Sequence, residues 1–112
     1  MSDDLFNTIY NKSLDLLSRR EHSFKEIKEK LSARFENKKI IESVIEKLSD
    51  NNLVNNTRYA EAYVSARKRK GFGPKKIAFE LSSKGVDESV TNSVIIEEGD
   101  WESAAKLAFS KK

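Results

Sequence analysis

The sequence contains an internal repeat, which becomes visible when the chain is aligned with itself at an offset of about 50 residues. Ile27 then falls on Ile77 and Leu31 on Leu81. Three further pairs match in the same register: Ile40 with Val90, Val44 with Val94, and Ile45 with Ile95. Repeats of this length are typical of solenoid arrays, in which each unit packs mainly on its neighbours. We therefore expect an elongated, curved molecule with three-helix repeats at residues 3–51 and 55–97, and the first helix of an incomplete third repeat at residues 100–112.

The fold class is predicted to be all-α, because apolar residues recur at helical spacing and the period-2 alternation of strands is missing. Seven helices are expected, marked by Leu5, Ile9, Leu16 and Leu17; by Ile27 and Leu31; by Ile41, Val44, Ile45 and Leu48; by Tyr59, Ala62, Tyr63 and Ala66; by Ile77 and Leu81; by Val90, Val94 and Ile95; and by Ala104, Ala105, Leu107 and Ala108. Tyr59 and Tyr63 are expected to pack in the core rather than to stack on nucleic-acid bases. Trp101 is expected to anchor the last helix on the second repeat.

The second helix of each repeat is predicted to begin at an equivalent position, with different capping chemistry. Ser23 and Glu26 form the capping-box pattern S-x-x-E, whereas Gly73 precedes a proline that suits the first helical position. His22 and Phe72 occupy the position before the cap, where a side chain can staple onto the helix; Phe72 could instead stack on a base or fill a pocket of a partner. Further caps are expected at Asn37, Asp87 and Gly85.

The composition excludes several classes of function. The chain has no cysteine, which removes disulfides, thiolate metal sites and thiol nucleophiles. Its one histidine, His22, has no metal ligand or triad partner at a suitable spacing, and GFGP is a poor phosphate loop because its proline lacks an amide hydrogen. No apolar run is long enough to span a membrane, and the N-terminus lacks the pattern of a signal peptide. We expect a cytoplasmic protein that is not an enzyme, with no cofactor and no membrane partner.

Positive charge is concentrated between residues 67 and 85, which hold seven basic residues and one acid, Glu80, in a chain of net charge +3. Such a local field favours an anionic partner. The predicted binding residues are Arg67, Lys68, Arg69, Lys70, Lys75 and Lys76, together with Arg19, Arg20 and Arg58. The basic residues at 67–70 are consecutive and cannot share one helical face, so about half of them should point at a partner. Lys75 and Lys76 begin a helix, where a purely structural role would favour acids.

A structural interpretation of these residues also stays open. Runs of charged side chains often do no more than solvate an exposed face. Arg19 and Arg20 lie near the end of the first predicted helix, where the helix dipole itself favours cations.

Three segments stand out by their order and spacing: RREHSFKEIKEKL at 19–31, RYAEAYVSARKRKGFGPKKIAFEL at 58–81, and KGVDESV at 84–90. Together they resemble the RecX family of bacterial recombination regulators. The resemblance implies tandem three-helix repeats and a non-enzymatic modulator that lies in the groove of the RecA filament. It also implies restraint of filament growth, ATP hydrolysis, strand exchange and coprotease activity, and members of the family contact DNA. The family usually has three full repeats, so the short third repeat departs from it.

Two hypotheses about the basic segment follow. In the first, the partner is the RecA filament on DNA. In the second, the segment meets DNA phosphates directly and the protein binds DNA without sequence preference. A third class, an adaptor that dimerises through its terminal helix, is also open, although a monomer is expected.

Overall fold

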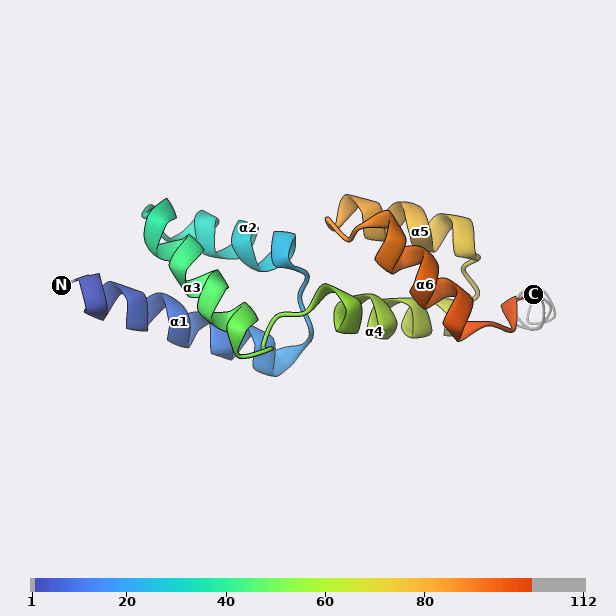
Figure 1. The fold of residues 1–112 in the computed structure, drawn as a ribbon, viewed down its shortest axis with the longest axis horizontal. Helices are drawn as coiled ribbons and strands as arrows, with labels where there is room; N and C mark the ends of the chain where they lie inside the picture. Colours follow the sequence, from blue (N-terminus) through green and yellow to red (C-terminus); the bar gives the residue numbers. More distant parts are fainter. Residues whose placement is uncertain (1, 102–112) are drawn as a thin grey trace. The chain divides into compact units, whose positions relative to one another are not determined.

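The computed structural model describes residues 2–101 of the chain, and this part contains six α-helices and no strand (Figure 1). The helices are α1 (Ser2–Arg19), α2 (Phe24–Arg34), α3 (Lys38–Asp50), α4 (Asn56–Arg69), α5 (Pro74–Ser83) and α6 (Glu88–Glu98). The prediction of an all-α fold built from three-helix units is confirmed. The predicted opening helix of a third repeat falls almost entirely on residues 102–112, which lie outside the described residues, and it stays a prediction.

The chain divides into two compact units, Met1–Asn55 and Asn56–Lys112. In the first unit α3 packs against both α1 and α2, and in the second unit α6 packs against both α4 and α5 (Figure 1). Each unit therefore uses its third helix to close a small core of its own.

The two cores follow the internal repeat. Ile27 and Leu31 are fully buried in the first unit, and so are their counterparts Ile77 and Leu81 in the second. The first core consists of Ile9, Ile27, Leu31, Ile41, Val44, Leu48 and Val54. The second consists of Tyr59, Ala60, Val64, Ile77, Leu81, Val86 and Val94. Full burial of one such aliphatic side chain stabilises a fold by about 1.5–3 kcal/mol, so these positions hold the helices together.

The helix starts confirm most of the predicted caps. The Ser23 hydroxyl accepts a hydrogen bond from the Glu26 amide at 3.1 Å, and the Glu26 carboxylate accepts one from the Ser23 amide at 3.2 Å, which completes the capping box. Gly73 is the N-cap of α5 with proline next to it, as expected. Asn37 caps α3 through its side chain, but Asp87 only occupies the N-cap position of α6 and makes no side-chain cap. The predicted N-cap position of Asp87 is therefore confirmed, although the residue makes no side-chain hydrogen bond there.

The inward face of α4 differs in part from the predicted one. Tyr59 is buried as expected, and its ring lies 5.8 Å from that of Tyr63, so both tyrosines pack within the unit. The other buried positions are Ala60 and Val64, whereas Ala62 is exposed. The small size of alanine made its side of the helix ambiguous in sequence, and the β-branched Val64 marks the true core face.

Candidate partner-binding surface

The four consecutive basic residues at the end of α4 divide into two pairs. Arg67 and Lys68 are partly buried and bonded within the second unit, whereas Arg69 and Lys70 are exposed. The division follows from helix geometry, because side chains at successive positions point about 100° apart. Half of the run is therefore exposed, and its predicted contact with a partner stays a prediction.

Arg67 is engaged in an ion pair with Glu80 of α5. Its Nε atom donates to Glu80 Oε1 at 3.0 Å and its Nη2 atom donates to Oε2 at 2.8 Å. The Tyr63 hydroxyl also donates to Oε1, at 2.9 Å. The Arg67 hydrogen bond is the main reason that the pKa of Glu80 lies below its ordinary value, with burial acting in the opposite direction. Glu80 is the one acid in the basic segment, a feature that could have suggested an internal pair but did not show which cation would form it.

The turn after α4 brings an aromatic ring under the Arg67 guanidinium. Gly71 adopts a φ of 94°, a left-handed conformation that glycine accepts without strain. The Phe72 amide then donates to the Arg67 carbonyl at 3.2 Å, which folds the chain back along the helix end. As a result the guanidinium carbon of Arg67 lies 3.8 Å from the centre of the Phe72 ring. Phe72 also packs against the core of the second unit, so its predicted structural role is the one observed.

Lys68 is bonded to the end of α6. Its Nζ atom donates to the Gly99 carbonyl at 2.6 Å and lies 3.8 Å from a carboxylate oxygen of Glu98. It also lies 5.4 Å from the ring of Trp101, whose indole nitrogen donates to the Ile95 carbonyl at 2.8 Å. A cation at a helix C-terminus is favoured by the helix dipole and by the unpaired carbonyls there. Lys68 therefore serves the structure of the unit.

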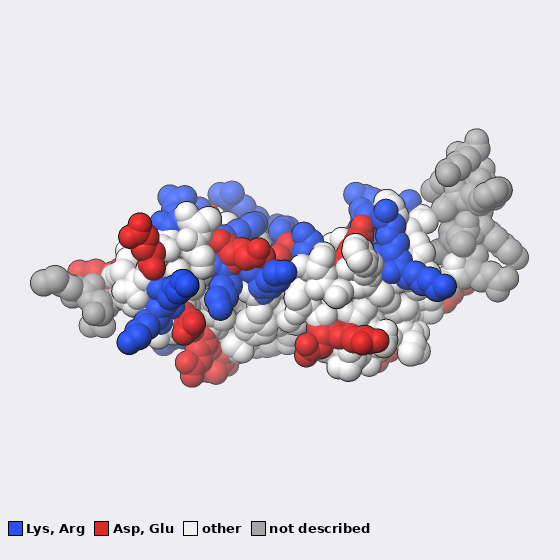
Figure 2. Space-filling view, turned by 90° about the horizontal axis from the view of Figure 1, so that it is seen from above, with Lys and Arg blue, Asp and Glu red and all other residues white. Residues whose placement is uncertain are grey.

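Four more basic residues of the segment flank the turn 71–73, and we call them the corner patch: Arg69, Lys70, Lys75 and Lys76. The seventh, Lys84, is half-buried at the other end of α5. All four residues of the corner patch are exposed, and none forms an ion pair within the described part of the chain. They lie at the end of α4 and the start of α5, on either side of the turn 71–73. Figure 2 shows a band of Lys and Arg side chains on the second unit, whereas basic and acidic side chains are intermixed on the visible face of the first.

Three predicted residues lie away from the corner patch in sequence and have their own partners. Arg19 forms an exposed ion pair with Asp15 at 3.3 Å. Arg20 makes two hydrogen bonds to the Glu26 carboxylate, at 3.1 and 3.2 Å, and so braces the capping box of α2. Arg58 is half-buried near the start of α4. Arg19 and Arg20 belong to the first unit, and Arg58 lies at the opposite end of α4 from Arg69. The predicted binding role of all three residues stays a prediction.

His22 occupies a polar site that sequence reasoning missed. It is buried, and its Nδ1 atom lies 3.0 Å from the Arg20 carbonyl while its Nε2 atom lies 2.8 Å from Lys30 Nζ. Because an ammonium group can only donate, Nε2 accepts and Nδ1 carries the proton, so the ring is neutral. Both ring nitrogens thus have hydrogen-bond partners, and the predicted staple of His22 onto the helix stays a prediction. Lys30 lies eight positions further along the chain, which is too far for a local sequence pattern to reveal the pair.

The described residues contain no cluster of three or more histidine, cysteine or acidic side chains that could hold a metal ion. In the same range, no helix is both long and apolar enough to cross a bilayer. The fold and the surface together define a protein of tandem three-helix units with a basic, exposed corner on the second unit.

Family comparisons identify the class more closely. The RecX first three-helix domain matches residues 10–48, and the RecX second three-helix domain matches residues 55–95. The chain belongs to the RecX family of regulatory proteins.

Individual relatives agree with this assignment. The regulatory protein RecX of Pseudomonas fluorescens strain Pf-5 is 33% identical over 110 residues, which cover 97% of this chain and 71% of the relative. RecX of Halorhodospira halophila is 35% identical over 101 residues, covering 89% of this chain and 63% of the relative. The crystal structure of RecX from Lactobacillus salivarius has a TM-score of 0.81 at 32% identity, over 94% of this chain and 67% of that one. A second RecX crystal structure has a TM-score of 0.84 at 23% identity, over 98% of this chain and 54% of that one, and shows the fold alone.

Proposed function

We propose that this protein acts in the bacterial cytoplasm by binding the RecA filament on DNA and inhibiting its recombinase, ATPase and coprotease activities. It would thereby modulate homologous recombination and DNA repair. Membership of the RecX family supports the regulatory role. The corner patch supports the binding of a large anionic assembly.

The corner patch is the observation that carries the proposal. Lys75 and Lys76 stand in the first turn of α5, which contains no acid. Cations at a helix start are unfavourable by about 0.3–1 kcal/mol each, because they oppose the helix dipole. An anionic partner would offset this cost, and four exposed cations that form no ion pair within the described residues could contact it without rearrangement of the fold.

A second candidate function is direct, sequence-indifferent DNA binding by the same four side chains. It is favoured by their exposure, because unpaired Lys and Arg side chains bind phosphates of any sequence. The two candidates differ in what the patch touches: a protein–DNA filament in the first and naked phosphates in the second.

Charge reversal tests the role of the corner patch. The variant Arg69→Glu, Lys70→Glu, Lys75→Glu, Lys76→Glu should require at least about tenfold more protein to inhibit the DNA-dependent ATPase of RecA, since every candidate contact becomes repulsive. Arg67 and Lys68 stay unchanged, because reversing them would set acids against Glu80 and Glu98.

A matched control reverses four exposed lysines of the first unit: Lys28, Lys38, Lys39 and Lys47. This control changes the net charge by the same amount and should inhibit nearly as well as the unaltered protein. Equal inhibition by a folded corner-patch variant would reject the patch as the binding surface. Equal losses in both variants would mean that net charge alone governs binding.

Salt dependence separates the two candidate functions. A direct DNA binder with about four phosphate contacts should lose affinity for naked duplex with a log–log slope near −3.6. A filament binder should instead bind RecA assembled on DNA far more tightly than it binds RecA alone or DNA alone. Equal affinity for naked DNA and for the filament would favour the second candidate.

A further inference from the structure

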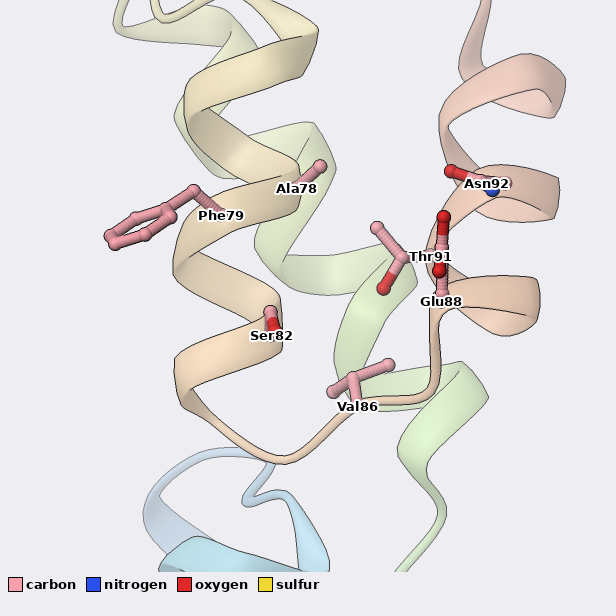
Figure 3. A pocket seen from close by; sticks show the side chains of 7 residues that line it. All are labelled: Ala78, Phe79, Ser82, Val86, Glu88, Thr91 and Asn92. Carbon is pink, nitrogen blue, oxygen red and sulfur yellow. The ribbon is translucent and has the colours of Figure 1, made fainter.

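The second unit carries a hollow between α5 and α6 that no residue of the corner patch lines. It encloses about 260 Å³ and is lined by Ala78, Phe79, Ser82, Val86, Glu88, Thr91 and Asn92 (Figure 3). A cavity of about 150 Å³ can hold a benzene molecule. The hollow therefore has room for one large side chain of another molecule.

Thr91 supplies the hollow with a buried polar group that lacks a partner. The residue is 3% exposed, and its hydroxyl oxygen has no hydrogen-bond partner in the part of the chain that the structure describes. Figure 3 shows its side chain directed from α6 toward α5. A buried hydroxyl without a partner costs about 1–3 kcal/mol, so a polar group entering the hollow would bind favourably there.

The first unit shows that the fold does not require a threonine at this position. Thr91 corresponds to Ile41, because each residue donates its backbone amide to the N-cap carbonyl of its helix at 3.0 Å. Ile41 is fully buried in the core of the first unit. Since an isoleucine fills the equivalent site, the threonine in the second unit is not explained by packing.

Two other residues that line the hollow also differ from their counterparts in the first unit. Phe79 stands where the first unit has Glu29, and Ala78 stands where it has Lys28. Phe79 is 77% exposed, and Figure 3 shows its ring projecting outward from α5. Two charged surface positions of one unit are thus apolar in the other, beside a hollow that contains an unsatisfied hydroxyl.

The charges around the hollow indicate the chemistry of its occupant. Lys75 is exposed on α5 one helical turn before Phe79, so the two side chains lie on the same face of the helix. Glu88 lines the other side of the hollow, where its carboxylate would repel a nucleic-acid phosphate. This arrangement fits a protein segment that places an apolar side chain in the hollow and an acidic one beside Lys75 on the α5 side, away from Glu88.

We propose that the hollow receives an apolar side chain from a segment of the filament protein, with a flanking acidic residue at Lys75 and a polar group at Thr91. This inference rests on the proposed function, because that function names the protein that supplies the segment. The inference adds that the second unit recognises an apolar side chain of the filament protein as well as negatively charged groups. Phe79 is the exposed residue that makes this contact.

Two substitutions test the hollow in the full chain. Phe79→Ser removes the exposed ring, and Thr91→Ile narrows the hollow and removes its hydroxyl with the residue that the first unit uses. Each should weaken binding to preassembled RecA–DNA filaments by about tenfold, as measured by fluorescence anisotropy, while binding to naked single-stranded DNA stays the same. Thr91→Ile should melt no lower than the unaltered protein, so a loss of binding would not reflect unfolding.

Ile96→Ser is the matched control for the exposed ring. Ile96 is 76% exposed, lies in the same unit and does not line the hollow. It should bind filaments as the unaltered protein does, and equal weakening by Phe79→Ser and Ile96→Ser would overturn the inference by pointing to general surface hydrophobicity.

The remaining outcomes are also decisive. Full filament binding by both hollow variants would overturn the inference alone, whereas an unaltered protein that binds no filament would overturn the proposed function with it. If Phe79→Ser weakened binding to naked DNA equally, the ring would be stacking on bases. If it abolished self-association in sedimentation, the occupant would be a second copy of the chain. Either result would overturn the inference.

Discussion

Arg67 and Glu80 form a bidentate ion pair that ties the end of α4 to the middle of α5, with distances of 3.0 and 2.8 Å. The Phe72 ring supports the guanidinium from the turn between the two helices. The pair therefore helps to fix the direction in which the two sides of the corner patch project. Its role is to position the surface, and the exposed side chains next to it supply the contacts.

The first prediction concerns the loss of the Glu80 charge. Glu80→Gln should lower the melting temperature at pH 7, because Arg67 would keep its partly buried position without a carboxylate. Filament inhibition should weaken less than in the corner-patch variant, since all four exposed cations remain. Thermal melting by circular dichroism and the RecA ATPase assay measure the two effects.

The pH dependence of this pair has a defined sign. The folded state lowers the pKa of Glu80 below its ordinary value of 4.5, mainly through the hydrogen bond from Arg67. The resulting stabilisation is fully present above pH 4.5 and is lost as the pH falls through the lower pKa of the folded state. The Glu80→Gln variant should not show this loss of stability at acid pH. Glu97→Gln, an exposed acid of the same unit, should keep it, and identical acid profiles for both variants would contradict the assignment.

The second prediction uses His22, the one histidine in the chain. Burial lowers its pKa from the ordinary value of 6.5, and the nearby cations Arg20 and Lys30 act in the same direction. The unfolded chain therefore takes up a proton at a higher pH than the folded chain does. Stability should fall as the pH drops below 6.5 and should stop falling, as far as this group is concerned, below the folded pKa.

The histidine signal in a proton NMR titration checks this directly, because no other residue gives such a signal. Its midpoint should lie below 6.5, and Lys30→Met should move it upward by removing a neighbouring positive charge. A midpoint at or above 6.5 would show that the imidazole is not held in its neutral form.

The third prediction concerns Lys68, which joins α4 to the end of α6. Lys68→Met should destabilise the second unit by about 0.3–1 kcal/mol, because the carbonyls at the helix end lose a cation. Trp101 is the one tryptophan and packs beside Lys68, so its fluorescence should shift to longer wavelength as the ring becomes more exposed. Lys70→Met, at an exposed position two residues further on, should change neither signal.

The fold could be predicted from the sequence because its determinants are local and occur in both repeats. Ile27 and Ile77 share a register, and the Ser23 capping box and the Gly73–Pro74 start mark the same helix boundary. Each signal spans only a few residues, so helical spacing and capping rules are sufficient to find it. Asp87 shows the limit of this approach, because a suitable residue at the N-cap position did not form the side-chain bond.

The candidate surface was only partly predictable, because it depends on contacts between helices. Nothing local distinguishes Arg67 and Lys68 from the two basic residues that follow them. Their orientation is set by Glu80, which is 13 residues from Arg67, and by the Gly99 carbonyl, which is 31 residues from Lys68. The hollow at Thr91 likewise requires two helices to be placed side by side before its missing hydrogen bond can be seen.

The fourth prediction transfers the cap of the first unit to the second. The backbone of Gly73 has φ −80° and ψ 169°, close to the φ −73° and ψ 163° of Ser23, so a serine would fit there without strain. No atom lies within 4 Å of a Cβ added at Gly73, and its hydroxyl would face the amide of Lys76 as that of Ser23 faces Glu26. Gly73→Ser should therefore stabilise the protein by about 0.5–1 kcal/mol, through the new cap and through a less flexible unfolded chain.

Urea unfolding of Gly73→Ser and Gly73→Ala separates these two contributions. Alanine restricts the unfolded chain in a similar way but offers no hydroxyl, and it is a poor N-cap residue. The serine variant should be more stable than the alanine variant, and equal stabilities would show that no cap forms. Because both variants keep all four cations of the corner patch, they should inhibit the RecA ATPase as the unaltered protein does. A loss of inhibition in both folded variants would mean that the turn must bend for binding, and that glycine at position 73 serves the partner rather than the helix.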